Sequence, residues 1–160
     1  MPRTLCLNGP HHAVGFTLIE LIIVIVITGI LASVAAPRFF ERTAFDERGY
    51  YEDTLAALRY AQKLAVATGC EVQVTISPNN YTLNQHATNC TTGAFTRDVF
   101  NPGNPGAPYS KTAPASLGMA PAQTFVFNGL GESNAPATVT LSGSADTRTI
   151  NVVAETGFVY

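Results

Sequence analysis

Residues 16–36 read FTLIELIIVIVITGILASVAA, a run of 21 residues in which Glu20 is the single charged side chain. As a helix that rises 1.5 Å per residue, the run spans about 31 Å, which is close to the thickness of a bilayer's hydrocarbon core. Its isoleucines and valines also suit a buried strand, but strands rarely exceed about 10 residues. The length therefore predicts a membrane-spanning helix over 16–36.

The segment before this run does not look like an ordinary export signal. Residues 1–15 read MPRTLCLNGPHHAVG. A secretory signal peptide places an apolar stretch of roughly 7–15 residues before its cleavage site. Residues 1–15 have no such stretch, so another kind of leader is expected.

A second helical segment is predicted over 37–69. Pro37 lacks an N–H and clashes with the preceding turn, so we expect it to disturb the helix where the apolar run ends. Beyond it, a mostly apolar stripe recurs at intervals of three and four residues: Tyr51, Leu55, Leu58, Ala61, Gln62 and Ala65. Gly69 readily adopts the left-handed conformation that closes helices. This half of the helix is therefore amphipathic and is expected to pack against a domain.

After Gly69 the period of the apolar residues changes to two. The alternation predicts a strand over 71–76, a turn at Pro78-Asn79-Asn80 and a second strand near 81–83, which together form a hairpin. Further short strands are predicted at 124–127, 137–141 and 149–153. Residues 86–122 include the stretch NPGNPGAP at 101–108 and are predicted to form a long surface loop.

These segments predict an α+β fold. A long N-terminal helix, with a membrane-spanning first half and an amphipathic second half, packs on a small antiparallel β-sheet head over 70–160. Charged residues make up 12% of the chain, about half of the usual ~25%. The net charge of −2 offers no broad attraction for nucleic acid, and beyond Gly69 the bases are Arg97, Lys111 and Arg148.

The junction Gly15-Phe16-Thr17-Leu18-Ile19-Glu20 carries a family resemblance. It resembles the prepilin signature of type IV pilins and type II secretion pseudopilins, in which a small residue precedes a phenylalanine and a glutamate follows four residues later. The resemblance implies that a prepilin peptidase cuts after Gly15 and methylates the new amine of Phe16. It also implies a bacterial inner-membrane protein with a single pass and a periplasmic head, which then enters a pilus or pseudopilus.

Glu20 has a physical interpretation that agrees with this resemblance. A carboxylate in the membrane costs about 2.5–3.5 kcal/mol, so it persists where it has a partner or a function. Cleavage would supply a partner, because the new ammonium of Phe16 can pair with Glu20 in the same chain or on a neighbouring subunit, where a low dielectric strengthens the attraction. The alternative is a protonated, unpaired Glu20 that reaches toward the interface.

The head resembles a narrower branch. Residues 45–76, FDERGYYEDTLAALRYAQKLAVATGCEVQVTI, resemble the GspH/FimT branch of minor pilins and pseudopilins. With CTTG at 90–93 and the ending ETGFVY, the chain is most similar to the MshC-type minor pilins of the mannose-sensitive haemagglutinin (MSHA) system. This implies a minor subunit that initiates or caps a pilus, with a type II secretion minor pseudopilin as the alternative. The leader departs from the usual basic type, because Arg3 is its single basic residue.

The cysteines fit an exported head. Cys6 falls in the leader, which leaves Cys70 and Cys90 as an even pair in a part that would face an oxidising compartment. A disulfide is predicted, and the alternative is two unrelated buried thiols. No CxxC motif or Cys/His spacing indicates a metal site.

Catalysis is not predicted. It needs a nucleophile, a base and an orienting group gathered in a cleft, whereas His86 is the single histidine after residue 15 and falls in a predicted polar loop. The carboxylates at 46, 47, 52 and 53 are expected to form a solvated face or to pair with Arg42 and Arg48. No catalytic residue, cofactor or metal is therefore assigned.

DNA uptake is the other function considered. Some FimT-like minor pilins bind DNA through arginines near the C-terminus, but no arginine follows Arg148 here. Phe158 and Tyr160 are expected to pack on the sheet rather than to stack on bases. The expected partners are other pilin or pseudopilin subunits, the prepilin peptidase, the inner-membrane assembly platform and membrane lipid, and not nucleic acid.

Overall fold

The computed structural model describes residues 16–144 and 146–160, apart from the side chains of residues 34–41. The chain divides into two compact units, Met1–Phe39 and Phe40–Tyr160. The predicted leader, including Gly15, lies outside the described residues, as do the side chains around Pro37 where a disturbance of the helix was expected.

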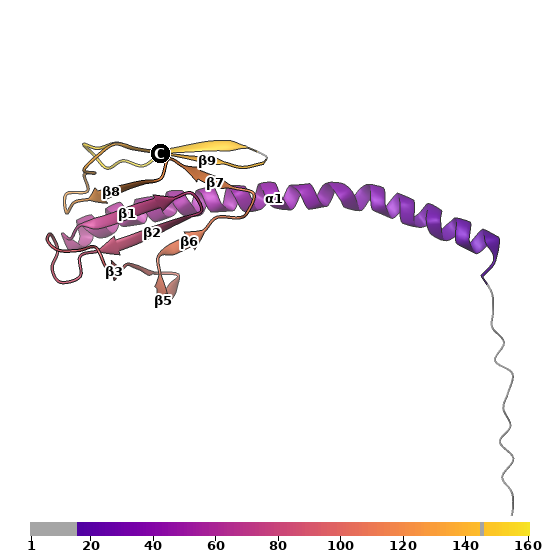
Figure 1. Ribbon diagram of the computed structural model, residues 1–160, viewed down its shortest axis with the longest axis horizontal. Coiled ribbons are helices and arrows are strands. Elements are labelled where there is room, and N and C mark those ends of the chain that lie inside the picture. The colour runs from indigo at the N-terminus through magenta and orange to yellow at the C-terminus, as the bar shows by residue number, and fades with distance from the viewer. Residues whose placement is uncertain (1–15, 145) are drawn as a thin grey trace, which may run out of the picture. The chain divides into compact units, whose positions relative to one another are not determined.

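One long helix, α1 (Leu18–Thr68), contains the N-terminal segment and the helical part of the head (Figure 1). It ends where the sequence predicted, because Gly69 follows with a φ of 66°, a left-handed conformation that favours glycine. The Thr68 hydroxyl also donates to the Leu64 carbonyl oxygen at 2.7 Å. The helix therefore closes with a side-chain bond and a glycine.

The head half of α1 buries one stripe of side chains. The members exposed by 2% or less are Tyr50, Thr54, Ala57, Leu58, Ala61 and Ala65. The predicted stripe is confirmed at its centre and shifted by one residue at its start, because Tyr50 is buried and Tyr51 is half-buried. Tyr50 reaches Tyr81 of the sheet, with ring centroids 6.0 Å apart.

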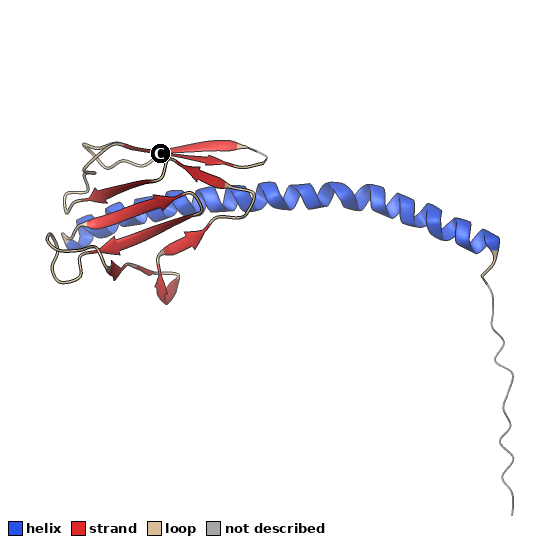
Figure 2. Ribbon diagram, in the orientation of Figure 1, coloured by secondary structure: helices blue, strands red, loops and turns tan. Residues whose placement is uncertain are grey.

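The largest sheet is built on the predicted hairpin. Strands β1 (Val72–Ser77) and β2 (Asn80–Gln85) pair antiparallel, with Val72 opposite Gln85. Strand β8 (Gln123–Phe127) pairs with the other side of β1, while β3 (Arg97–Asp98) and β6 (Ser110–Thr112) pair with β2. All of these pairs are antiparallel, as Figure 2 shows by its red arrows.

The predicted antiparallel sheet is accompanied by two smaller ones. A second sheet has the order β10-β9-β7, formed by β7 (Gly118–Ala120), β9 (Ala137–Ser142) and β10 (Thr147–Val152). A two-stranded ribbon pairs β4 (Phe100–Asn101) with β5 (Asn104–Pro108). The prediction that residues 86–122 form one long surface loop was wrong, because this stretch contains β3 to β7. These strands are two to five residues long and polar or rich in proline and glycine, so they show no alternation.

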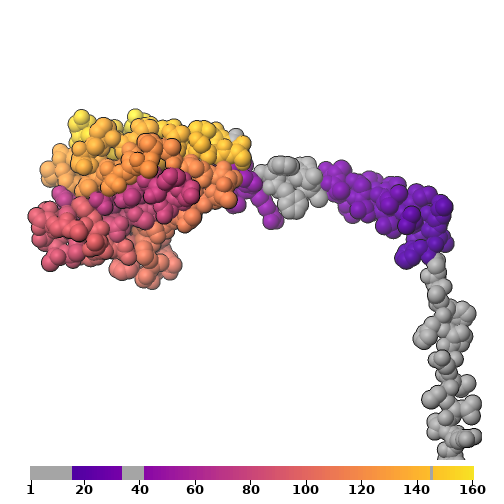
Figure 3. All heavy atoms as spheres, viewed as in Figure 1, coloured from indigo at the N-terminus to yellow at the C-terminus, as the bar shows by residue number. Residues whose placement is uncertain are grey.

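The core lies between these sheets and α1. Alternate strand residues face inward, as the pattern of buried and half-buried residues along β1 shows. The fully buried strand side chains include Val72, Val74, Ile76, Leu83, Phe125, Phe127, Val139, Leu141 and Ile150. In Figure 3 the orange and yellow C-terminal part of the head packs beside the magenta hairpin on the face in view. A helix packed on small antiparallel sheets is the α+β head that the sequence predicted.

Candidate functional site

The N-terminal end of α1 is fixed by a capping interaction. Thr17 precedes the first helical residue, and its Oγ1 accepts the backbone N–H of Glu20 at 3.3 Å. The Thr17 carbonyl oxygen accepts the N–H of Leu21 at 3.2 Å. Thr17-x-x-Glu20 therefore has the spacing of a capping box, which stabilises a helix start.

Glu20 lies in the first turn of α1. A negative side chain is favourable there, because the unpaired N–H groups give the helix start a partial positive charge. Glu20 is exposed, and within the described part of the chain its carboxylate makes no ion pair. Its predicted pairing with the amine of Phe16 stays a prediction.

The residues that follow form a helix that is apolar on all sides. Every large apolar side chain from Phe16 to Leu31 is exposed, by 41–80%. The polar side chains here bond to their own helix, since the Thr28 hydroxyl donates to the Val24 carbonyl and the Ser33 hydroxyl to the Ile30 carbonyl, both at 2.7 Å. A helix that is apolar all round is typical of a buried environment, in a large core or in lipid.

Among the described residues, no helix is long and apolar enough to cross a bilayer. The predicted span 16–36 continues past Ser33 into residues 34–41, whose side chains lie outside the description.

The predicted cysteine pair is joined. Cys70 and Cys90 form a disulfide with their Cα atoms 4.2 Å apart, and the Cys90 carbonyl oxygen accepts the N–H of Glu71 at 2.8 Å. The bond ties the segment after β2 to the start of the hairpin. It is therefore part of the framework of the head.

His86 is buried, although it falls in the polar stretch that was predicted to form a surface loop. Its ring is only 4% exposed, and it stacks on Phe95 with centroids 3.9 Å apart. Its Nε2 lies 2.9 Å from the Glu71 carboxylate, and its Nδ1 lies 2.9 Å from the Gly93 carbonyl oxygen. The hairpin register carries the missed signal, because Glu71 and His86 are the next pair after Val72 and Gln85. The pair therefore connects the start of the hairpin with the disulfide-linked loop through Gly93.

For Glu47, the predicted alternative of a solvated side chain was wrong. It is 6% exposed, and its Oε1 accepts the backbone N–H of Ser144 at 2.9 Å and the Ser144 hydroxyl at 2.8 Å. A Cβ at Gly143 would overlap this carboxylate, so glycine permits the close approach. Glu47 thus holds the turn between β9 and β10 on the helix.

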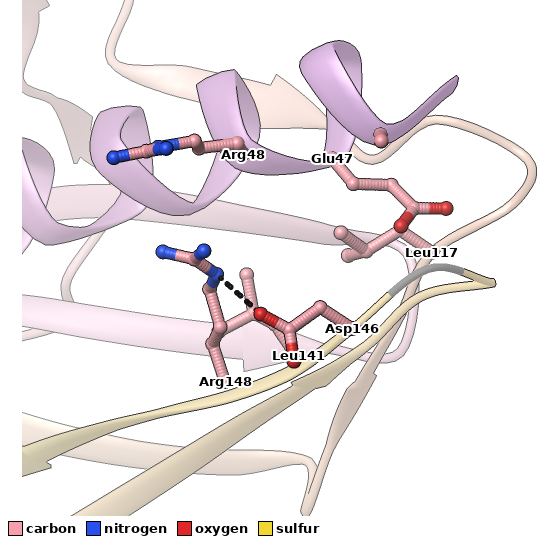
Figure 4. A pocket seen from close by; sticks show the side chains of 7 residues that line it. Glu47, Arg48, Leu117, Leu141, Asp146 and Arg148 are labelled. Carbon is pink, nitrogen blue, oxygen red and sulfur yellow. Dashed lines mark hydrogen bonds and ion pairs between the residues drawn. The ribbon is translucent and has the colours of Figure 1, made fainter. Parts of the chain in front are cut away.

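A small cavity of about 200 Å³ lies beside this contact (Figure 4). Its polar lining includes Arg48, Asp146 and Arg148, and the Asp146 carboxylate accepts Arg148 Nε at 3.2 Å. The Arg148 guanidinium also lies 5.2 Å from the centre of the Tyr51 ring. Figure 4 shows Glu47 and Arg48 pointing in different directions from the helix. The charged side chains that line the cavity are Glu47, Arg48, Asp146 and Arg148. They are better explained as polar contacts between the helix and the strands than as a reactive site.

The bases beyond Gly69 are engaged with neighbours in the head. Arg97 donates to the Gln85 side chain at 2.9 Å, Lys111 pairs with Asp53, and Arg148 pairs with Asp146. Across residues 16–144 and 146–160, no three His, Cys, Asp or Glu side chains come together as a candidate metal site.

The last residues are bound to α1 through their backbone. Arg59 Nε and Nη2 both donate to the Val159 carbonyl oxygen at 3.2 Å, and Gln62 donates to the Thr156 carbonyl oxygen at 2.8 Å. Phe158 and Tyr160 do not pack on the sheet as predicted. They are 58% and 55% exposed and stack on each other, while Val159 between them is buried, as the alternation of an extended chain requires.

Two family models match this chain. The model described as type II transport protein GspH matches residues 51–157, and the prokaryotic N-terminal methylation motif matches residues 15–36. The second match contains Gly15, Phe16 and Glu20.

Curated relatives match over shorter stretches. The type IV narrow pilus major component PilA5 of Thermus thermophilus is 51% identical over 54 residues, which are 34% of this chain and 47% of the relative. A fimbrial protein of Pseudomonas aeruginosa is 38% identical over 66 residues, which are 41% of this chain and 43% of the relative. The matched stretches span about half the length of these relatives.

Solved structures show the same fold. The minor pseudopilin EpsH of the type 2 secretion system of Vibrio cholerae has a TM-score of 0.52 at 15% identity, covering 74% of this chain and 94% of that one. The type IV minor pilin FimU of Pseudomonas aeruginosa has a TM-score of 0.50 at 15% identity, covering 76% and 90%. Because the GspH model matches most of its length, the chain belongs to the type II transport protein GspH family.

Proposed function

We propose that this chain is a minor pilin-type subunit that takes part in initiating or capping an MSHA-like pilus. The observation that carries the proposal is the apolar helix from Phe16 to Leu31, whose large side chains are exposed on every side. Such a surface needs lipid or the helices of other subunits around it. The methylation motif over residues 15–36 supports the same role.

The proposed sequence of events follows from this helix. The chain is held in the bacterial inner membrane with its head in the periplasm, and a prepilin peptidase cuts after Gly15. The assembly platform then moves the subunit from lipid into a filament, where helices of neighbouring subunits replace the lipid. Glu20 pairs there with the ammonium of Phe16, because a low dielectric strengthens the attraction. The role is structural rather than catalytic.

A second candidate is a minor pseudopilin of a type II secretion system. The description of the matching family favours it. Deleting the gene distinguishes the two roles. Loss of surface pili with normal protein secretion supports the pilus, and the reverse result supports the secretion system.

The proposal is tested by mass spectrometry of the N-terminus of the membrane-extracted protein. The expected result is a chain that begins at Phe16 with a methylated amine, and Gly15→Asp is expected to block the cleavage. An assembled protein that retains residues 1–15, or that is cut elsewhere, contradicts the proposal.

A further inference from the structure

We propose that the groove between α1 and the edge strand β3 binds an extended peptide segment of another protein, which pairs with β3 and places a tyrosine side chain beside Gln85. The inference goes beyond the proposed function, because it applies to a pilus and to a secretion system alike. It concerns the head alone, since the residues that carry it lie in the second compact unit, Phe40–Tyr160.

The starting observation is a buried amide without a partner. Among the described residues, Gln85 Nε2 is the single buried side-chain nitrogen or oxygen that lacks a hydrogen bond, and Gln85 is 8% exposed. Arg97 Nη2 donates to Gln85 Oε1 at 2.9 Å, and because arginine can only donate, the amide oxygen must face it. The N–H groups of the amide therefore face away from Arg97. A buried donor without an acceptor is unfavourable, so this one indicates that an acceptor is missing.

A groove beside Gln85 has room for a ligand. It has a volume of about 390 Å³ and lies between α1 and the segment that contains β3 and β4. The helix contributes Tyr60 and Leu64 to its lining, and the strands contribute Gln85, Arg97 and Phe100. The groove thus combines aromatic and apolar side chains with the residue whose amide has no acceptor.

The aromatic side chains of the groove suit an aromatic ligand. Phe100 is 57% exposed, whereas its neighbour Val99 is 3% exposed, as the alternation of an extended chain requires. Tyr60 is held in place by stacking on Tyr109, with ring centroids 5.1 Å apart. A ring that enters beside them buries apolar area and can pair with both in an offset or edge-to-face geometry.

The charges of the groove favour a neutral ligand. Its lining contains one base, Arg97, and one acid, Asp98. Nucleic acid requires clustered bases that neutralise its phosphates, and a single base beside an acid does not provide them. A peptide backbone is neutral and offers both donors and acceptors.

Strand β3 has a free edge on which such a backbone can pair. The strand order β3-β2-β1-β8 places β3 at the end of its sheet, and the described residues supply no strand on its other side (Figure 1). Charged side chains often protect an edge from pairing. Here both are bonded to β2, because Asp98 Oδ1 accepts Asn84 Nδ2 at 3.0 Å and Arg97 donates to Gln85. Addition of an extended peptide to a free edge is an established mode of recognition.

The register of the sheet selects the ligand side chain. Arg97 lies opposite Gln85, so their side chains share one face of the sheet. Leu83, two residues before Gln85, is buried on that face, which packs on α1. A side chain of the added strand on the same face enters the groove. Tyrosine supplies a ring for the aromatic lining and a hydroxyl that accepts from Gln85 Nε2 after a rotation of the amide.

The test is an NMR titration of the purified full chain in detergent micelles. The probe is a pentapeptide, blocked at both ends, with tyrosine at its centre and threonine elsewhere. Saturable shifts are expected for the side-chain amide of Gln85 and the backbone amides of Asp98 and Phe100. A phenylalanine-centred peptide and a backbone N-methylated tyrosine peptide are each expected to bind about tenfold more weakly, because each loses hydrogen bonds to the protein.

Three variants assign the binding to the groove. Gln85→Leu should remove the preference for tyrosine over phenylalanine. Phe100→Ala, a change at an exposed position, should weaken binding of both peptides, whereas the control Phe158→Ala, at a similarly exposed ring, should not.

Several results would overturn the inference. They are the absence of saturable shifts, shifts confined to other parts of the head, equal binding of the tyrosine and phenylalanine peptides, and equal binding of the N-methylated peptide. Retention of the tyrosine preference in Gln85→Leu would overturn it as well. The titration does not depend on cleavage after Gly15 or on entry into filaments, so the inference can fail while the proposed function stands.

Discussion

The two units of the chain use apolar side chains in opposite ways. From Phe16 to Leu31 the large apolar side chains are exposed by 41–80%, whereas the head buries Leu58, Phe125 and Val139 at 1% or less. The head is therefore folded by its own core, while the apolar surface of the N-terminal helix is available to lipid or to other subunits. Truncating a large apolar side chain is then expected to destabilise the head but not the N-terminal helix.

The largest effect on stability is expected from deleting a core ring. Phe125→Ala should lower the free energy of unfolding of the head by about 3–5 kcal/mol, because Phe125 is 1% exposed and its removal leaves a cavity. Ile25→Ala in the N-terminal helix is the matched control and should not change it. Denaturant unfolding of the full chain in detergent measures both. Equal effects of the two variants would refute the comparison.

Loss of the disulfide is expected to lower the free energy of unfolding of the head somewhat less than Phe125→Ala does. Cys70 and Cys90 are 20 residues apart, and closing a loop of that size stabilises a fold by about 3 kcal/mol in the entropy model. Cys70→Ser should therefore lower the abundance of the protein and leave cleavage at Gly15 unchanged. Thiol labelling of the denatured, unreduced protein is the independent check. Two free head thiols before reduction would exclude the bridge.

The contact between Glu47 and Ser144 is expected to have a smaller effect on the stability of the head than the disulfide has. Glu47→Gln weakens the bonds from the Ser144 N–H and hydroxyl, which should cost about 1–2 kcal/mol because bonds to a charged acceptor are stronger than neutral ones. Asp46→Asn changes the adjacent, exposed carboxylate and should have little effect. The difference in denaturant midpoint between these variants measures the contribution of the buried contact. Similar midpoints would mean that the contact is not stabilising.

The smallest effect at neutral pH is expected from the buried tyrosines. Burial raises the pKa of Tyr50 to about 12 and also raises the pKa of Tyr81 and Tyr109. The unfolded tyrosines ionise near pH 10, so the stabilisation is full below that pH and is lost as the pH rises toward 12. Unfolding followed by circular dichroism should therefore show constant tyrosine-linked stability up to about pH 9 and a fall above pH 10. In Tyr50→Phe that fall should be smaller.

The sequence predicted the features that depend on local pattern. The end of α1 before Gly69, the hairpin at β1 and β2 and the Cys70–Cys90 pair follow from turn chemistry, alternation and cysteine number. The short strands β3 to β7 could not be predicted, because their pairing is decided by long-range contacts and not by their own residues. The same holds for Glu47, whose partner Ser144 is distant in the sequence and is reached only because Gly143 leaves space.

Some features of the candidate site could likewise be predicted from the sequence, and others could not. The apolar run and the GFTLIE junction were apparent from sequence, and the methylation motif matches both. The roles of Gly15, Phe16 and Glu20 stay predictions, because they concern a leader outside the described residues and partners in other chains. His86 was missed because a lone histidine in a polar stretch gives no sign that it will lie opposite Glu71.

The central claim is that the N-terminal helix serves assembly through Glu20, and the Glu20→Val variant tests it most directly. The substitution removes a charge from an apolar helix, so membrane insertion should be retained. Immunoblots of membranes and of sheared filaments from the same cells measure the distribution of the protein. The account predicts a normal amount in the membrane and a strongly reduced amount in filaments. Entry of the variant into filaments at the level of the unmodified protein would contradict it.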